Sequence, residues 1–205
     1  MRYFLSILFI FLFVSCATKN QATQEDLGLE ITEVRPNKWT ALTKQNLVHL
    51  FQVYELDPYL YTRKIRVQSR VIPHSHPVLT LNTRYAEHPN KLLASLLHEE
   101  LHWFVGGENA KKTNKAIEEL KKIYPQVPKE GGAKSTHSTY LHLIVCYLEY
   151  ISIIHYLGEK EAKKMIEEMI KKDKVYPWIY TQVLYKNFAI KRVVHKYRLL
   201  PKALL

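Results

Sequence analysis

The chain has 205 residues, a formal net charge of +11 and 47% hydrophobic residues. It is long enough for one hydrophobic core without disulfide staples, and with only two cysteines it is not a disulfide-dense scaffold. The many lysines fall beside glutamates on amphipathic segments, which is typical of solvated helix faces, and no nucleic-acid-binding motif accompanies them. We therefore expect a single domain, a monomer, that does not bind nucleic acid.

The N-terminus has the pattern of an export signal. Residues 1–15 contain one basic residue and then an apolar run that is too short for a typical membrane span. Its end, Phe13-Val14-Ser15-Cys16, resembles a bacterial lipobox, although Phe13 stands where leucine is usual. We expect a signal peptide at 1–15, a lipidated Cys16 and a flexible polar tether at 16–27. An ordinary signal peptide or an uncleaved anchor is the alternative.

If Cys16 carries lipid, the protein is an exported lipoprotein, anchored to a membrane of the bacterial cell envelope. Where two membranes exist, it would lie in the outer membrane or face the periplasm. Cys146 would then have no disulfide partner in the chain. Because Cys146 falls in an apolar run, we expect it to be a small buried core residue.

Residues 28–205 form the expected domain, and its first part has short strand patterns. The region Pro73–Pro77 lies between two of them and is interpreted as a hairpin loop, in which His74 and His76 are better explained as exposed residues than as metal ligands. The predicted elements are a strand at Leu29–Val34, a helix at Thr43–Leu56 with Thr43 as a candidate cap, and strands at Lys64–Ile72 and Val78–Thr83.

The stretch Leu92–Val105 is the most informative one. It is apolar, has the length of a buried helix with Pro89 at its expected start and Gly106-Gly107 at its stop, and contains the pattern H-E-x-x-H at residues 98–102. Residues four apart share a helix face, so His98 and His102 project together and can bind one Zn²⁺. Glu99, the next residue along the helix, would be the general base that activates a zinc-bound water.

Helical patterns fill the rest of the chain. The expected fold class is therefore α+β, with a small N-terminal sheet followed by a mainly helical region. The predicted helices are Glu108–Tyr124, a long helix from a cap at Thr136 or Ser138 through Leu157 that Gly158 ends, Glu159–Asp173, and Pro177 to about Tyr197.

The order of strands, H-E-x-x-H helix and further helices resembles that of the zincin zinc metallopeptidases, over roughly Lys64 to Leu157. The resemblance implies a zincin-like domain with the motif on a buried helix, a catalytic zinc ion and hydrolysis of peptide bonds. In that group the strand before the metal helix commonly offers its edge to an extended substrate. Val78–Thr83 would take that part here.

The third zinc ligand is left open among three residues. Glu149 is acidic in an apolar helix, where an unpaired carboxylate is costly, and it resembles the ligand that gluzincins carry on a later helix. His142 lies two turns earlier and matches a gluzincin oxyanion-stabilising position, a role that Tyr140 could share. We favour Glu149 as the ligand and His142 as the catalytic residue. The alternative makes His142 the ligand and Glu149 its hydrogen-bonding partner, and Glu108 is the third candidate.

The expected function is zinc-dependent hydrolysis of amide bonds in the cell envelope, on a peptide, a protein or a peptide-containing wall polymer. His137 and His155 are weaker candidates for substrate contacts. The alternative is a non-catalytic metal-binding or interaction lipoprotein, in which the H-E-x-x-H pattern has no catalytic role. The presence of Glu99 favours the enzyme, because a scaffold that only binds metal would not need a base.

Overall fold

The structure, a computed structural model, describes residues 23–172 and 175–205. The predicted signal peptide, Cys16 and most of the predicted tether lie outside the described residues. The elements in chain order are β1 (Glu30–Val34), α1 (Lys38–Val53), a short 3-10 helix (Asp57–Tyr59), β2 (Lys64–Gln68), β3 (Leu79–Leu81), α2 (Pro89–Gly106), α3 (Ala110–Ile123), α4 (Thr136–Leu157), α5 (Glu159–Lys172), α6 (Pro177–Tyr185), α7 (Phe188–Lys196) and a last 3-10 turn (Lys202–Leu204).

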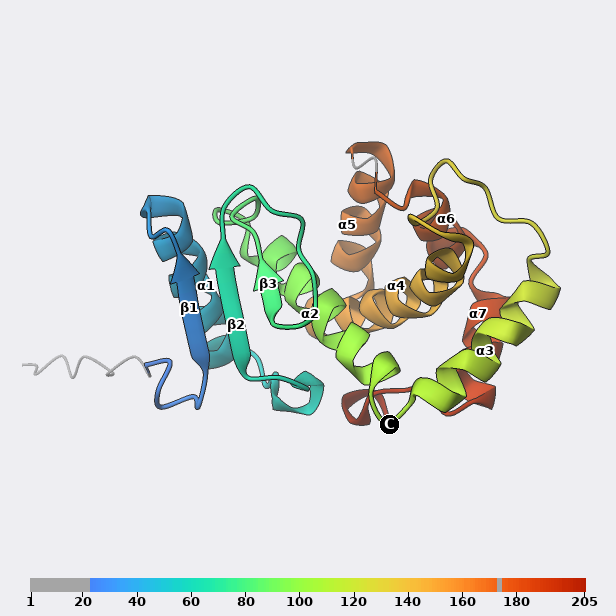
Figure 1. Ribbon diagram of the computed structural model, residues 1–205, viewed down its shortest axis with the longest axis horizontal. Helices are drawn as coiled ribbons and strands as arrows, with labels where there is room; N and C mark the ends of the chain where they lie inside the picture. The colour runs from blue at the N-terminus through green and yellow to red at the C-terminus, as the bar shows by residue number, and fades with distance from the viewer. Residues whose placement is uncertain (1–22, 173–174) are drawn as a thin grey trace, which may run out of the picture.

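The fold is α+β, as the sequence predicts, with the small sheet at one end and helices α3 to α7 towards the other (Figure 1). The sheet has the order β1-β2-β3, and α1 and α2 pack on one of its faces. Ile65 and Val67 of β2 and Leu79 and Leu81 of β3 are buried, while Arg66 is only half-buried. Alternation along β2 thus separates an apolar set of side chains from a polar one.

Helix α1 begins at Lys38, ahead of the predicted cap. Asn37 is the actual N-cap, because its side chain accepts hydrogen bonds from the amides of Trp39 and Thr40, and the Thr40 hydroxyl accepts one from the Asn37 amide. Thr43, the predicted cap, is fully buried inside the helix and donates its hydroxyl proton to the Trp39 carbonyl. A capping box therefore sets the start of α1, ahead of its apolar periodicity.

The predicted hairpin between Lys64–Ile72 and Val78–Thr83 is wrong. Strands β2 and β3 are parallel, with Ile65 paired to Leu79. The chain leaves β2 through a turn in which Arg70 has a left-handed backbone (φ 60°), and it returns along the far edge of β3, where His74 pairs antiparallel with Thr80. Strand alternation carries no information on the direction or the partner of a strand, so the sequence could not reveal this return segment, residues 71–78.

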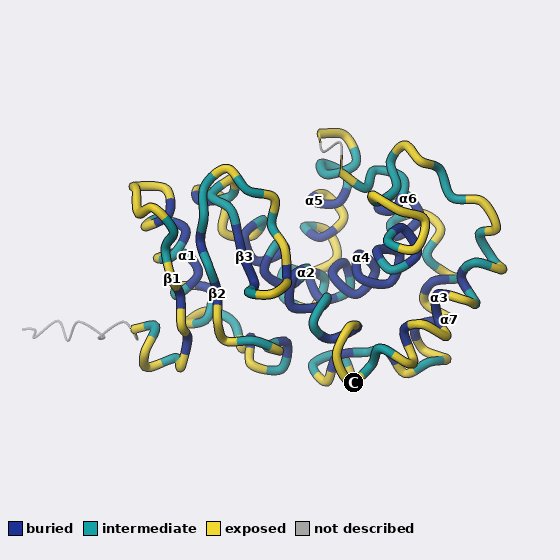
Figure 2. Tube along the Cα trace, viewed as in Figure 1, coloured by how far each residue is buried: buried dark blue, intermediate teal, exposed yellow. Residues whose placement is uncertain are grey.

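Helices α2 and α4 form the centre of the molecule. Helix α2 begins at Pro89 and ends at Gly106, which confirms the predicted start and stop. Helix α4 packs against α2, α3, α5, α6 and α7. It is long and apolar enough to cross a membrane by length and composition, but it is mostly buried here, as a core helix is (Figure 2). The Ser135 side chain caps it, one residue before the predicted Thr136, and Gly158 (φ 79°) ends it as predicted.

The remaining helices follow the prediction with one difference. Helices α3 and α5 match the predicted segments to within two residues at each end. The last predicted helix is divided at Lys186-Asn187 into α6 and α7, and the Asn187 side-chain amide donates to the Val183 carbonyl at the break. Buried apolar side chains from the sheet and from all these helices belong to one hydrophobic cluster, which fixes α2 and α4 against each other.

Candidate metal centre

Helix α2 holds His98 and His102 on one face. Residues four apart return to nearly the same side of an α-helix, and the two ring centroids lie 5.0 Å apart. Most of the rest of α2 is apolar and buried, which holds the helix, and with it both imidazoles, in a fixed orientation. The buried leucines are Leu92, Leu93, Leu96, Leu97 and Leu101.

Helix α4 brings a third imidazole, that of His142, to the same place. Its ring centroid lies 4.9 Å from that of His102 and 5.7 Å from that of His98. The potential ligand atoms of His98, His102 and His142 all lie within 4.8 Å of one another. These three residues could hold a metal ion, since imidazole nitrogen is a common ligand for several divalent metals.

Two of the three rings are oriented through Nδ1. Nδ1 of His142 lies 2.7 Å from the Ser138 carbonyl oxygen, which can only accept, so Nδ1 donates and Nε2 carries the free lone pair. Nδ1 of His98 lies 2.8 Å from Oε2 of Glu149 and donates to that carboxylate. The Nε2 atoms of both rings therefore remain for a metal, in the tautomer that metal-ligating histidines adopt when the other ring nitrogen is hydrogen-bonded.

Glu149, the predicted third ligand, lies behind His98. Its side chain is 1% exposed, and Oε2 accepts hydrogen bonds from Nδ1 of His98 and from the Tyr180 hydroxyl, the latter at 2.9 Å. Burial and the nearby Cys146 and Glu149 raise the pKa of Tyr180 well above its ordinary value, so its phenol keeps the proton that it donates. The arrangement matches the alternative interpretation of the sequence, in which Glu149 supports a ligating histidine.

Cys146 is fully buried, as predicted, but it is also part of this centre. It lies one helical turn from both His142 and Glu149, and its sulfur lies within 4.8 Å of a ring nitrogen of His98. Potential ligand atoms of His98, Cys146 and Glu149 form a second group within 4.8 Å. His98 belongs to both groups, with Nδ1 directed at Glu149. One metal ion bound through Nε2 therefore leaves Cys146 and Glu149 on the opposite side of the ring.

The pKa of His98 is shifted in the opposite direction from those of His102 and His142. Burial, followed by the charge of His98, lowers the pKa of His102 to about 2 and that of His142 to about 4. Burial by itself would lower the pKa of His98, but the charge of Glu149 and the hydrogen bonds with Cys146 and Glu149 raise it well above its ordinary value. At neutral pH two of the rings are already in the neutral form that binds metal, and a metal ion would displace the proton of His98.

A cavity of about 210 Å³ opens beside this centre, lined by His98, Glu99, Glu149, Tyr176 and Tyr180; of the three histidines, only His98 reaches it. Glu99 is buried, and that burial, opposed by His98, raises the pKa of its carboxyl group. A carboxylate with a raised pKa next to the imidazoles is suited to accept a proton near neutral pH.

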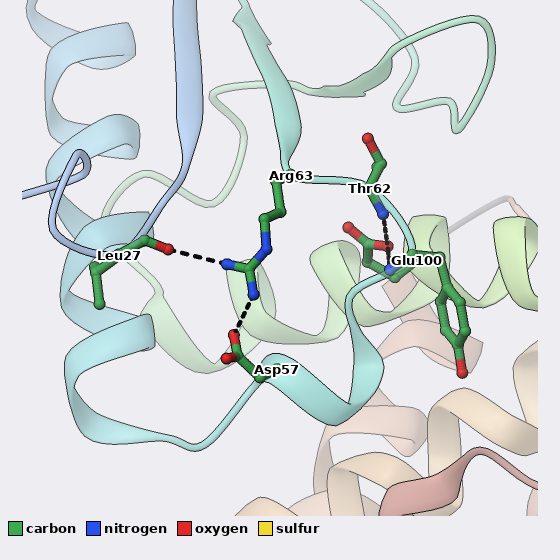
Figure 3. Close-up of polar contacts among 6 residues, drawn as sticks. Leu27, Asp57, Thr62, Arg63 and Glu100 are labelled. Carbon is green, nitrogen blue, oxygen red and sulfur yellow. Dashed lines mark hydrogen bonds and ion pairs between the residues drawn. The ribbon is translucent and has the colours of Figure 1, made fainter.

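Glu100, the next residue of the motif, points away from the cavity. Its Oε2 accepts hydrogen bonds from the amides of Tyr61 and Thr62, while Oε1 is buried without a partner. Burial raises the pKa of Glu100 to about 8. Figure 3 shows this carboxylate under the loop before β2, near Arg63, which bonds to Asp57 and to the Leu27 carbonyl. Glu100 therefore ties α2 to the sheet and takes no part in the cavity.

The sequence analysis does not identify two tyrosines of this centre, Tyr180, which bonds to Glu149, and Tyr176. The ring centroid of Tyr176 lies 4.3 Å from that of His142 and 6.4 Å from that of His98. It precedes Pro177 at the start of α6 with a left-handed backbone (φ 62°). Nothing in the sequence singles out one tyrosine among 14. The left-handed conformation of a residue with a bulky side chain is the unusual feature, and it is visible only in the structure.

The other sequence candidates are outside the histidine group. His74 and His76 are exposed, as predicted, on the return segment beside α2, where His76 stacks on Trp103. Glu108 is exposed beyond the end of α2. Among the described residues none of these belongs to a group that could hold a metal. The Tyr140 hydroxyl donates to the Tyr124 carbonyl, so it is not directed at the cavity. The last two candidates, His137 and His155, are exposed.

The edge of β3, predicted to take an extended substrate, is already paired at Thr80. The Thr80 amide donates to the His74 carbonyl at 2.8 Å, and the Thr80 carbonyl accepts from the His74 amide at 3.0 Å. The return segment thus occupies the position at Thr80 that an added substrate strand would use. Residues of this segment, and not a free edge of β3, line that side of the cavity.

Comparison of the chain with protein-family models, with curated proteins and with solved structures found no match. The function of the chain is therefore inferred from the geometry of this centre.

Proposed function

We propose that the protein is a zinc-dependent hydrolase of amide bonds, a peptidase. One observation carries this proposal. The potential ligand atoms of three imidazoles from two helices lie within 4.8 Å of one another. Glu99, which follows His98, lines the adjoining cavity. Three nitrogen ligands and one open position are the pattern of catalytic rather than structural zinc sites, which have four protein ligands.

The residues present fit a zinc ion. With Zn–N distances of about 2.0–2.1 Å and tetrahedral geometry, two ligand nitrogens lie roughly 3.3 Å apart. The ligand atoms of the histidine group lie within 4.8 Å of one another, up to about 1.5 Å more than that value, a difference that side-chain rotation would have to close. His98, His102 and His142 would be the ligands. Glu149 would hold the ring of His98 through Nδ1, with Tyr180 fixing the carboxylate in turn.

When bound, zinc supplies a Lewis acid that activates water and polarises a carbonyl group. Glu99 would accept the proton of the attacking water and deliver it to the leaving amine, a role that its cavity position and raised pKa support. His142 serves as a ligand in this proposal and Tyr140 is bonded elsewhere, so neither donates to the developing oxyanion. The Tyr176 phenol is the polar group beside His142 that lines the cavity and could donate there.

The proposed setting is the cell envelope, with the chain anchored through a lipid on Cys16. The support is the sequence of residues 1–16 alone. Substrates would then be peptides, proteins or peptide-containing polymers outside the cytoplasm, within reach of the anchored domain.

Metal analysis of the purified full-length chain, followed by peptide hydrolysis assays, tests the proposal. We expect about one zinc per chain, lost in His142→Ala and retained in His155→Ala, a matched control on the exposed side of the same helix. A wild-type chain that remains metal-free after zinc is supplied would refute the metal centre. Zinc bound by all three histidines without hydrolysis of any peptide would favour the non-catalytic metal-binding lipoprotein.

A further inference from the structure

The cavity has one end at His98 and Glu99, and its other end is positively charged. Helix α2 runs from His98 back to Lys91, and both residues line the cavity. Nζ of Lys91 lies 2.8 Å from Oε2 of Glu168 on α5, and Nζ of Lys172 lies 4.0 Å from the same oxygen. Glu168 and Lys172 line the cavity as well. Two lysines share one carboxylate here, which leaves net positive charge to attract an anionic group.

Between the two ends the walls are largely apolar. Met165 and Met169 line the cavity from α5, and Ile72 lines it from the return segment although 84% of its surface is exposed. The volume of about 210 Å³ is below the roughly 300–1,000 Å³ of pockets that enclose drug-sized ligands. A space of this size suits a short peptide segment that carries one apolar side chain. Methionine walls adapt to side chains of different shape.

The distance between the His98 end and the lysine end of the cavity limits the length of peptide that can lie between them. Lys91 precedes His98 by seven residues, or about 10.5 Å along the helix axis at 1.5 Å per residue. An extended peptide covers about 3.3–3.6 Å per residue, so roughly three residues fit between His98 and the lysines. The Lys91–Glu168 ion pair joins α2 to α5 at that end, where a continuing chain would have to pass.

We propose that the substrate is a peptide with a free C-terminal carboxylate, which Lys91 and Lys172 bind while an apolar side chain lies against Met165 and Met169. The inference rests on the proposed peptidase function and assigns its substrate class. Cleavage falls two or three residues before the carboxylate. The C–N bond of that amide breaks, the water oxygen bonds to the acyl carbon, and Glu99 passes the water proton to the leaving amine.

The test compares two probes on the zinc-loaded full-length protein. Both are N-acetylated hexapeptides of alanine with one leucine near the C-terminus, one ending in a free carboxylate and the other in a carboxamide. Mass spectrometry of the products gives the cleavage position, and kcat/KM is measured for each probe. Lys172→Met removes a cation whose side chain is 73% exposed, so the fold should tolerate it. Lys163→Met, on the exposed side of α5, is the matched control.

We expect the free acid to be cleaved at least about tenfold faster than the amide, as the loss of one charge-assisted hydrogen bond costs about 1.4 kcal/mol or more. Lys172→Met should remove most of this preference, and Lys163→Met should leave it. Equal rates for acid and amide, or cleavage far from the C-terminus, would overturn the inference and leave the peptidase proposal standing. If neither probe is cleaved, binding is measured by calorimetry. Preferential binding of the acid, lost in Lys172→Met, then supports the carboxylate site and counts against hydrolysis, while equal binding overturns the inference.

Discussion

Substitution of Glu149 by glutamine tests how the metal centre is built. The glutamine amide keeps the size of the side chain and one acceptor oxygen but removes the charge that holds Nδ1 of His98. Because Glu149 acts through His98 in our proposal, zinc should still bind. Loss of a hydrogen-bonding partner of a ligating histidine typically weakens metal affinity by about 10–100-fold. That factor corresponds to about 1.4–2.8 kcal/mol of binding free energy.

The loss of zinc affinity in Glu149→Gln should also lower the free energy of unfolding measured in the presence of zinc. At saturating zinc, stabilisation of the folded chain follows the logarithm of the ratio of zinc concentration to Kd, so Glu149→Gln should lose about 1.4–2.8 kcal/mol of the zinc-dependent part of the free energy of unfolding. In His142→Ala a ligand itself is missing, and zinc-dependent stabilisation should largely disappear. The contrast between the two variants separates a ligand from its supporting residue.

The assay is competition for zinc against a fluorescent chelator, with urea unfolding at fixed zinc concentration. Glu108→Gln, at an exposed position outside the histidine group, is the matched control and should behave like the wild type. Loss of zinc binding in Glu149→Gln together with retained binding in His142→Ala would contradict the assignment of His142 as the ligand. That result would return the ligand role to Glu149, as the sequence first suggests.

Four further predictions concern single residues. Glu99→Gln should keep zinc but lower kcat about 10²–10⁴-fold, measured on any peptide that the wild type hydrolyses; unchanged turnover would exclude Glu99 as the base. Glu100 has a pKa raised to about 8, so its contribution to the free energy of unfolding is fully present below its unfolded pKa and is lost as pH rises towards 8. Urea unfolding between about pH 5 and pH 8 should therefore show a smaller fall in stability for Glu100→Gln than for the wild type or Glu87→Gln, and equal slopes would contradict the burial argument. Zinc binding at about pH 6 should release about one proton, that of His98, in calorimetry with buffers of different ionisation enthalpy; a release near zero would mean that His98 is already neutral. Finally, Cys16→Ser should abolish lipid labelling and release the chain from membranes, whereas a variant that stays in the membrane with residues 1–15 attached would indicate an uncleaved anchor.

Local patterns predict most of the helices. The apolar run with Pro89 before it and Gly106-Gly107 after it predicts α2, and Gly158 marks the end of α4. Caps were less predictable, since Asn37 and Ser135 act through side-chain hydrogen bonds that depend on the local backbone. The direction of β3 was not predictable at all. It depends on a return segment whose pairing joins residues that alternation cannot assign to each other.

From the residues alone it follows that His98 and His102 share a face and that Glu149 needs a partner, because helical periodicity and the cost of a buried charge are local properties. The choice between His142 and Glu149 as the third ligand is not local. These two residues are seven apart on α4, about 10.5 Å along its axis, so only one of them can reach the position that the His98 and His102 rings share. Which one does so depends on where α4 crosses α2, and the packing of the buried core sets that crossing. In the tertiary structure it brings His142 to the two imidazoles and leaves Glu149 behind His98.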